Sequence, residues 1–250
     1  MGPKVKKRYA ALFIALLILI VGYSQRDQLV TRLLQVGIDR QFSSNIVHAL
    51  GDGLHVALCG AGSPLPSPTA SGPCVAVIAN GELYVVDVGS NSPRNLGRMG
   101  WPVAALEGVF ITHFHSDHID GLGEIMTLRW AGGDFDTPLP VYGPTGIDRV
   151  VAGFNEAYAL DFTYRQAHHG DAVAPLTAAG SQAVSFIKPP AGETVRLVEK
   201  DGLVIEAFAV THAPVEPAVG YRFTYKDRSV VITGDTVKDP NIVEMSRGAD

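Results

Sequence analysis

The sequence has little cysteine, little charge, and neither an internal repeat nor a low-complexity tract. Only 18% of its 250 residues are charged and 46% are hydrophobic, so the chain can bury one sizeable core. Nothing in the pattern indicates a second folded domain. We therefore expect one domain of catalytic size, preceded by an N-terminal tail.

A basic stripe is also missing from the main part of the chain. Residues 1–40 hold seven Lys/Arg and two Asp/Glu, which leaves 13 and 23 for residues 41–250 and gives that part a net charge of about −10. A domain that grips a long polyanion usually carries a basic surface, because neutralising phosphates provides most of the non-specific affinity. Nucleic acid is therefore not an expected partner.

The only two cysteines, Cys59 and Cys74, flank a Gly/Pro/Ser-rich stretch that we expect to join two strands. In an oxidising compartment they could pair and close a loop of about 15 residues, which would contribute about 3 kcal/mol. The alternative is two buried, unpaired thiols, because the distance between them cannot be read from the sequence. A zinc site on these cysteines is not expected, since no other ligands lie nearby.

The N-terminus has a basic start followed by an apolar run. Residues 9–23 carry no charged side chain. Four cations stand before them: Lys4, Lys6, Lys7 and Arg8. The run is shorter than the roughly 20 residues that span a bilayer comfortably, as in a cleavable signal, but no Ala-x-Ala cleavage pattern follows it. We favour an uncleaved anchor with its basic end in the cytoplasm, which places the protein on the inner membrane facing the periplasm, or exports it.

Three regions follow from this pattern. Residues 1–24 are expected to be a signal anchor or signal peptide, residues 25–50 a short helical linker with an amphipathic helix at 29–38, and residues 51–250 the catalytic domain. Within that domain, short apolar runs alternate with Gly, Pro and Asp, which indicates an α/β fold. The expected strands cover residues 54–58, 74–79, 83–88, 108–112, 141–142, 203–210, 219–225 and 229–233, and the expected helices cover residues 122–130 and 147–159.

One segment carries most of the recognisable chemistry. The strand expected at residues 108–112 leads into His113, His115, Asp117 and His118. His113 and His115 alternate by two, so an extended backbone places both on one side. Zinc suits imidazole and carboxylate ligands, and catalytic zinc sites keep one position open for water. Four ligands are too many for one open site, whereas two metals about 3.5 to 4 Å apart would use them all.

Two further ligand candidates follow strands much later in the chain. His212 comes after the strand expected at 203–210, and Asp235 after the strand expected at 229–233. Either residue alone would more often be an ordinary surface or core residue. They become candidate metal ligands only because the cluster at residues 113–118 already predicts a metal site.

The pattern His113-x-His115-x-Asp117-His118 after a strand resembles the hallmark of the metallo-β-lactamase superfamily. The closest resemblance is to the ribonuclease Z branch, which also contains exported arylsulfatase-like members. Four further segments carry it: residues 59–64, 141–144, 212–222 and 234–236. The resemblance implies a four-layer αββα sandwich, here preceded by an N-terminal membrane-anchor helix.

The resemblance also implies a di-zinc site. His113, His115 and His212 would hold one zinc, Asp117 and His118 the other, and Asp235 would bridge them. Asp87, in a strand-end segment that the family shares, could fix a ligand histidine or simply cap a turn. Arg222 could face a substrate anion or carry a solvated charge.

Two departures from the family pattern shape our expectations. The family continues after its aspartate and later supplies a seventh ligand histidine, whereas this chain ends at Asp250, so we expect the domain to be incomplete at its C-terminus and the second zinc site with it. Members that process tRNA carry a long arm between the counterparts of His212 and Asp235, where this chain has only 22 residues. The missing arm argues against tRNA 3′ processing.

The expected mechanism is attack by a metal-bridging hydroxide on a phosphorus, sulfur or carbonyl centre, with Asp117 orienting the attacking water. The favoured substrate is a small anionic phosphodiester or sulfate ester outside the cytoplasm. The alternatives are a ribonuclease Z-type RNA-processing endonuclease, a lactone hydrolase, or a non-enzymatic membrane-tethered binding module. A homodimer is possible.

Overall fold

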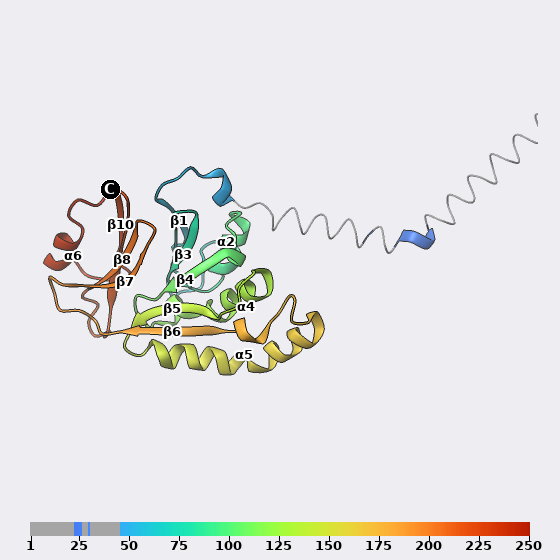
Figure 1. The fold of residues 1–250 in the computed structure, drawn as a ribbon. Helices are drawn as coiled ribbons and strands as arrows, with labels where there is room; N and C mark the ends of the chain where they lie inside the picture. The colour runs from blue at the N-terminus through green and yellow to red at the C-terminus, as the bar shows by residue number, and fades with distance from the viewer. Residues whose placement is uncertain (1–22, 27–29, 31–45) are drawn as a thin grey trace, which may run out of the picture. The chain divides into compact units, whose positions relative to one another are not determined.

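The computed structural model describes residues 23–26, 30 and 46–250 (Figure 1). The chain divides into two units, residues 1–44 and 45–250, and the second contains all the elements below. Almost all of the expected anchor at residues 1–24, and all but one residue of the helix expected at 29–38, lie outside the described residues. Among the residues that are described, no helix is long and apolar enough to cross a membrane.

Six strands form the first sheet, in the order β1-β2-β3-β4-β5-β6. They are β1 (His55–Gly60), β2 (Cys74–Ala79), β3 (Glu82–Val86), β4 (Leu106–Phe110), β5 (Leu139–Pro144) and β6 (Ser181–Phe186). The first three run antiparallel, and β3 to β6 run parallel. Asn80 and Gly81 form the turn between β2 and β3 with positive φ angles of 54° and 73°, as in a tight two-residue hairpin.

Four antiparallel strands form the second sheet, in the order β10-β9-β8-β7. They are β7 (Thr194–Lys200), β8 (Leu203–Ala209), β9 (Val219–Tyr225) and β10 (Arg228–Ile232). The two sheets pack face to face over a shared apolar core that includes Phe110, Tyr221 and Phe223. Tyr221 is fully buried and donates a hydrogen bond to the carbonyl of Ile111 at 2.6 Å, which ties β9 to the end of β4.

Helices cover the outer faces of both sheets unequally. On the first sheet lie α2 (Ser92–Arg98), α4 (Leu122–Gly132) and α5 (Ile147–His169), which bury a second apolar core, and Figure 1 shows α5 lying along β5 and β6. On the second sheet, the six-residue α6 (Pro240–Met245) packs on Phe208 and Val210. The described part of the chain is thus an αββα sandwich whose fourth layer is one short helix. The remaining short elements are η1 (Ile46–Ala49), η2 (Val103–Ala105), α3 (Ser116–Ile119) and η3 (Leu176–Ala178).

The sequence prediction missed two strands and several short helices, and it shortened one helix. Neither β6 nor β7 is among the strands that the sequence predicts. Both are edge strands rich in polar residues, so neither shows a clear apolar alternation. The short helices α2 and α6 also went unpredicted, and α5 continues ten residues past the expected end at 159. Its C-terminal half exposes Leu160 and Tyr164, so no clean amphipathic stripe marks it.

Cys59 and Cys74 form a disulfide across β1 and β2, with their Cα atoms 5.0 Å apart. Of the two possibilities that the sequence left open, the structure therefore shows pairing. The bond closes the loop of residues 61–73, which returns toward the segment after β3: Gly72 donates to the Ser90 carbonyl and Gly89 to the Pro73 carbonyl, both at 2.9 Å.

Candidate metal centre

The sequence-predicted ligands follow three strands that finish at the same edge of the sandwich. His113 and His115 follow β4, His212 follows β8 and Asp235 follows β10. β8 and β10 run in the same direction because both are antiparallel to β9. The two sheets meet at this edge, where the backbone N–H of Val219 donates to the carbonyl of Thr112 at 3.0 Å.

Four of these side chains converge. Within the described residues, the ligand atoms of His113, His115, His212 and Asp235 all lie within 4.8 Å of one another. His113 Nε2 is 3.0 Å from His115 Nδ1, and His212 Nε2 is 3.5 Å from the same atom. Three imidazole nitrogens that face one another so closely can be satisfied together by one cation, which suits the ligand set of zinc.

Asp117 and His118 lie beside this cluster, in the short helix α3. His118 is 1% exposed, and its Nε2 is a buried polar atom without a hydrogen-bond partner. That atom lies 3.6 Å from Asp235 Oδ1 and 3.9 Å from Asp117 Oδ2. A buried, unpaired nitrogen between two carboxylates is costly unless a further group binds there, and a second cation fits this arrangement. All six predicted ligands therefore lie together, with Asp235 between the two groups.

Asp87 forms hydrogen bonds to His118 and to Thr112, the residue before His113. It is buried, and its left-handed backbone (φ 57°) turns the chain immediately after β3. Its Oδ2 accepts from His118 Nδ1 at 2.7 Å and from the Thr112 hydroxyl at 2.8 Å, while Oδ1 accepts from the Thr112 backbone N–H at 2.8 Å. The sequence left the role of Asp87 open between fixing a ligand histidine and capping a turn. In the structure it binds His118 directly.

The electrostatics of the two buried histidines differ. Burial, followed by the neighbouring His118 and His212, lowers the pKa of His113 to about 3, so this ring is neutral at physiological pH and offers a lone pair. Burial also disfavours charge on His118, but the hydrogen bond and charge of Asp87, with Asp235 and Asp117, outweigh it and raise the pKa of His118.

Close backbone contacts fix Asp117. A Cβ added to Gly72 would lie 2.8 Å from the Asp117 carbonyl oxygen, and one added to Gly89 would lie 2.3 Å from it. Only glycine allows both loops to approach the start of α3 so closely. Sequence analysis did not single out these two glycines, because nothing in a single sequence distinguishes them from other loop glycines.

Comparison with known proteins identifies the fold and the family. The model of the metallo-beta-lactamase superfamily matches residues 69–249. This chain belongs to the metallo-beta-lactamase superfamily. Proteins named ribonuclease Z are close relatives: that of Mycobacterium avium (strain 104) is 35% identical over 198 residues, which cover 78% of this chain and 68% of the relative. That of Mycobacterium marinum is 33% identical over the same shares.

Solved structures agree on the fold. Human tRNase Z, short form, superposes with a TM-score of 0.61 at 21% identity, over 78% of this chain and 74% of that one. The metallo-beta-lactamase fold protein YhfI of Bacillus subtilis superposes with a TM-score of 0.57 at 19% identity, over 80% and 69%. The relatives named ribonuclease Z confirm the resemblance to that branch that the sequence indicated.

Other polar candidates lie outside the metallo-beta-lactamase centre. Arg222 donates to the carbonyls of Met245 and Arg247 at 3.1 Å each, so it fastens the segment after α6 and does not face the ligands. His168 and His169 end α5, where their rings stack on each other.

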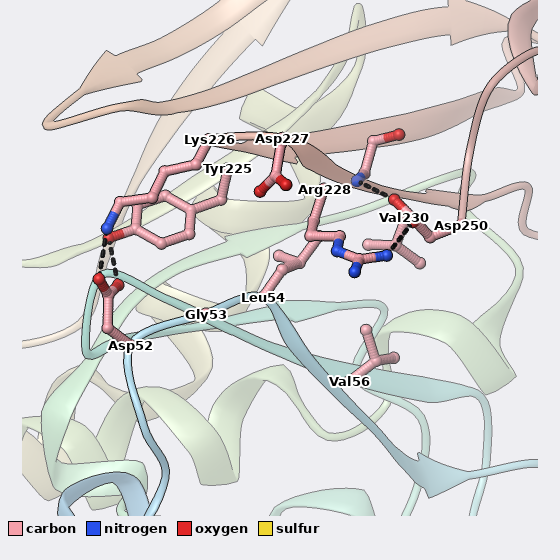
Figure 2. Close-up of a pocket in the computed structure, with 11 residues that line it drawn as sticks. Asp52, Gly53, Leu54, Val56, Tyr225, Lys226, Asp227, Arg228, Val230 and Asp250 are labelled. Atoms are coloured by element: carbon pink, nitrogen blue, oxygen red, sulfur yellow. Dashed lines mark hydrogen bonds and ion pairs between the residues drawn. The ribbon is translucent and has the colours of Figure 1, made fainter.

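A cavity of about 570 Å³ lies at the other end of the strands (Figure 2). It is lined by the turn between β9 and β10, whereas the metal ligand Asp235 follows the far end of β10. Figure 2 shows its charges paired with one another: Lys226 with Asp52, and Arg228 with Asp250. None of the predicted ligands lines this cavity, so its size does not mark the metallo-beta-lactamase centre.

Proposed function

We propose that this chain is a metal-dependent phosphodiesterase that cleaves RNA. The observation that carries the proposal is the convergence of His113, His115, His212 and Asp235, beside a buried His118 Nε2 that has no hydrogen-bond partner. The chain is also 35% identical to a protein named ribonuclease Z. His113, His115 and His212 would hold one zinc ion, Asp117 and His118 a second, and Asp235 both. Such a pair supplies an acidic water molecule and stabilises negative charge on phosphate oxygens.

The residues of the chain have distinct tasks in this scheme. Asp117 is nearly buried and held by the contacts of its backbone carbonyl, so its carboxylate can orient the attacking water from a fixed position. Asp87 accepts the hydrogen of His118 Nδ1, so that His118 Nε2 carries no hydrogen and keeps its lone pair for a metal. The chain needs no nucleophile of its own for this chemistry.

The proposed substrate differs from our first expectation. The sequence favoured a small phosphodiester or sulfate ester and made nucleic acid an unexpected partner, whereas the names of the relatives favour RNA over sulfate esters. The 22 residues between His212 and Asp235 are occupied by a loop and the β9–β10 hairpin, so they hold no projecting arm. RNA would therefore have to bind to residues outside the segment between His212 and Asp235. We also propose, from the basic and apolar start of the sequence, that residues 1–24 direct the chain to the inner membrane or beyond it.

The test is hydrolysis of end-labelled RNA, bis(p-nitrophenyl) phosphate and p-nitrophenyl sulfate by the full chain in the presence of zinc. We expect RNA and the phosphodiester to be cleaved, and cleavage to disappear after chelation and in His115→Ala. His168→Ala, which removes an exposed histidine at the end of α5, is the matched control and should retain activity. Cleavage of the sulfate alone would overturn the proposal, as would zinc-loaded protein that binds RNA without cleaving it.

A further inference from the structure

Thr112 lies at the point where the elements of the metal centre meet. It follows β4, directly precedes His113, and is 1% exposed. Its backbone N–H and hydroxyl both bond to the Asp87 carboxylate at 2.8 Å, and its backbone carbonyl accepts from Val219 at the start of β9. The backbone N–H, the backbone carbonyl and the hydroxyl of this buried threonine are thus all hydrogen-bonded, and they link β4 to Asp87 and to β9.

The hydroxyl of Thr112 also lies 3.0 Å from His113 Nδ1. A hydroxyl has a single hydrogen, and the Asp87 carboxylate can only accept, so the Thr112 hydrogen is donated to Asp87. The Thr112 oxygen must then accept the hydrogen of His113 Nδ1. This order leaves His113 Nε2 as a bare lone pair, and that is the atom facing His115 at 3.0 Å.

The same side chain supports the turn that presents Asp235. Gly234 has φ 59°, and a Cβ added there would lie 2.7 Å from Thr112 Oγ1 and 2.8 Å from Thr112 Cβ. The turn after β10 therefore rests directly on Thr112. Thr112 therefore contacts both parts of the metal centre. One is the histidine loop after β4 of the first sheet, and the other is the Asp235 turn after β10 of the second sheet.

We infer that Thr112 is a positioning residue for the metal centre, which fixes the Nδ1–H tautomer of His113 through its hydroxyl. The inference rests on the proposed metal-binding function and specifies how its first site is prepared. Partners behind metal-ligating histidines typically contribute about 10 to 100-fold to metal affinity.

The test compares Thr112→Val, which keeps the shape and loses the hydroxyl, with Thr112→Ser, which keeps the hydroxyl. Zinc affinity is measured on the full chain by competition with a chromophoric chelator. We expect Thr112→Val to weaken binding about 10 to 100-fold and Thr112→Ser to stay within about threefold. Thr127→Val is the matched control, because Thr127 is also buried and its hydroxyl binds only the Gly123 carbonyl in α4. It should bind zinc like the wild type.

A second measurement needs no metal. Long-range ¹H–¹⁵N spectra of the metal-free protein report which nitrogen of His113 carries the hydrogen. We expect Nδ1–H in the wild type and in Thr112→Ser, and a population of Nε2–H in Thr112→Val. The same tautomer in all three proteins, or an equal loss of zinc affinity in both variants, would overturn the role of the hydroxyl. Failure of the wild type to bind zinc would instead refute the proposed function itself.

Discussion

The two ends of the strands in this sandwich both carry charged side chains, but they arrange them differently. At the cavity end, Lys226 pairs with Asp52 and Arg228 with Asp250, and all four side chains are largely exposed. At the metal end, histidines face histidines, and the buried Nε2 of His118 has no hydrogen-bond partner. Charges that satisfy one another need no ligand, whereas the metal end holds a buried nitrogen whose bonding capacity a cation would satisfy. The comparison teaches that unmet bonding capacity, and not hollow volume, marks the functional end.

The largest expected effect comes from removing a ligand at the metal end. His113→Ala should weaken zinc binding by more than about 100-fold, since even the partners behind such ligands contribute up to that factor. Chelator competition measures the affinity. His169→Ala, at the exposed end of α5, should leave zinc affinity unchanged. Equal affinities in the two variants would break the comparison.

The disulfide joins β1 and β2, and its loop of residues 61–73 reaches the metal end. The double substitution of Cys59 and Cys74 by alanine should lower the free energy of unfolding by about 3 kcal/mol, because the unfolded chain regains the freedom of a 15-residue loop. Urea denaturation measures the loss, and the reduced wild type should show the same loss. A change below about 1 kcal/mol would mean that the crosslink constrains little in the unfolded chain.

Asp87→Asn should weaken zinc binding about 10 to 100-fold while keeping the shape of the side chain. The carboxylate accepts three hydrogen bonds through two oxygens, and an asparagine must turn its NH₂ group toward a donor. Zinc titration of the folded variant gives the affinity. Asp161→Asn, which removes an exposed carboxylate on α5, is the control. Wild-type affinity in Asp87→Asn would show that His118 is oriented by other contacts.

The smallest effect is expected at the cavity end. Asp52→Asn breaks the pair with Lys226, but both groups are exposed and solvent already screens them. The urea midpoint and the zinc affinity should both match the wild type within error. A clear loss of zinc affinity would show that the two ends communicate.

Much of this arrangement could be predicted from the sequence. β2 and β9 were predicted with the bounds that the structure has, because β2 is a continuous apolar run and in β9 apolar residues alternate with Gly220, Arg222 and Thr224. His113, His115, Asp117 and His118 are close in sequence and mark the metal end on their own. His212 and Asp235 could be proposed because each follows a strand.

The supporting residues could not be predicted in the same way. Thr112 and Gly234 are 122 positions apart in the sequence, and their contact exists only because the two sheets close at one edge. The tautomer of His113 depends on the hydrogen bonds of Asp87, which is 26 residues upstream. Edge strands such as β7 escaped prediction because their burial is set by neighbours and not by their own pattern.

The most direct test of the account is the zinc content of the full chain after reconstitution and removal of free metal, measured by mass spectrometry beside His113→Ala. We expect at least one zinc ion per wild-type chain, at His113, His115 and His212, and less zinc in the variant. A wild-type chain that retains no zinc, or a variant that retains as much as the wild type, would contradict it.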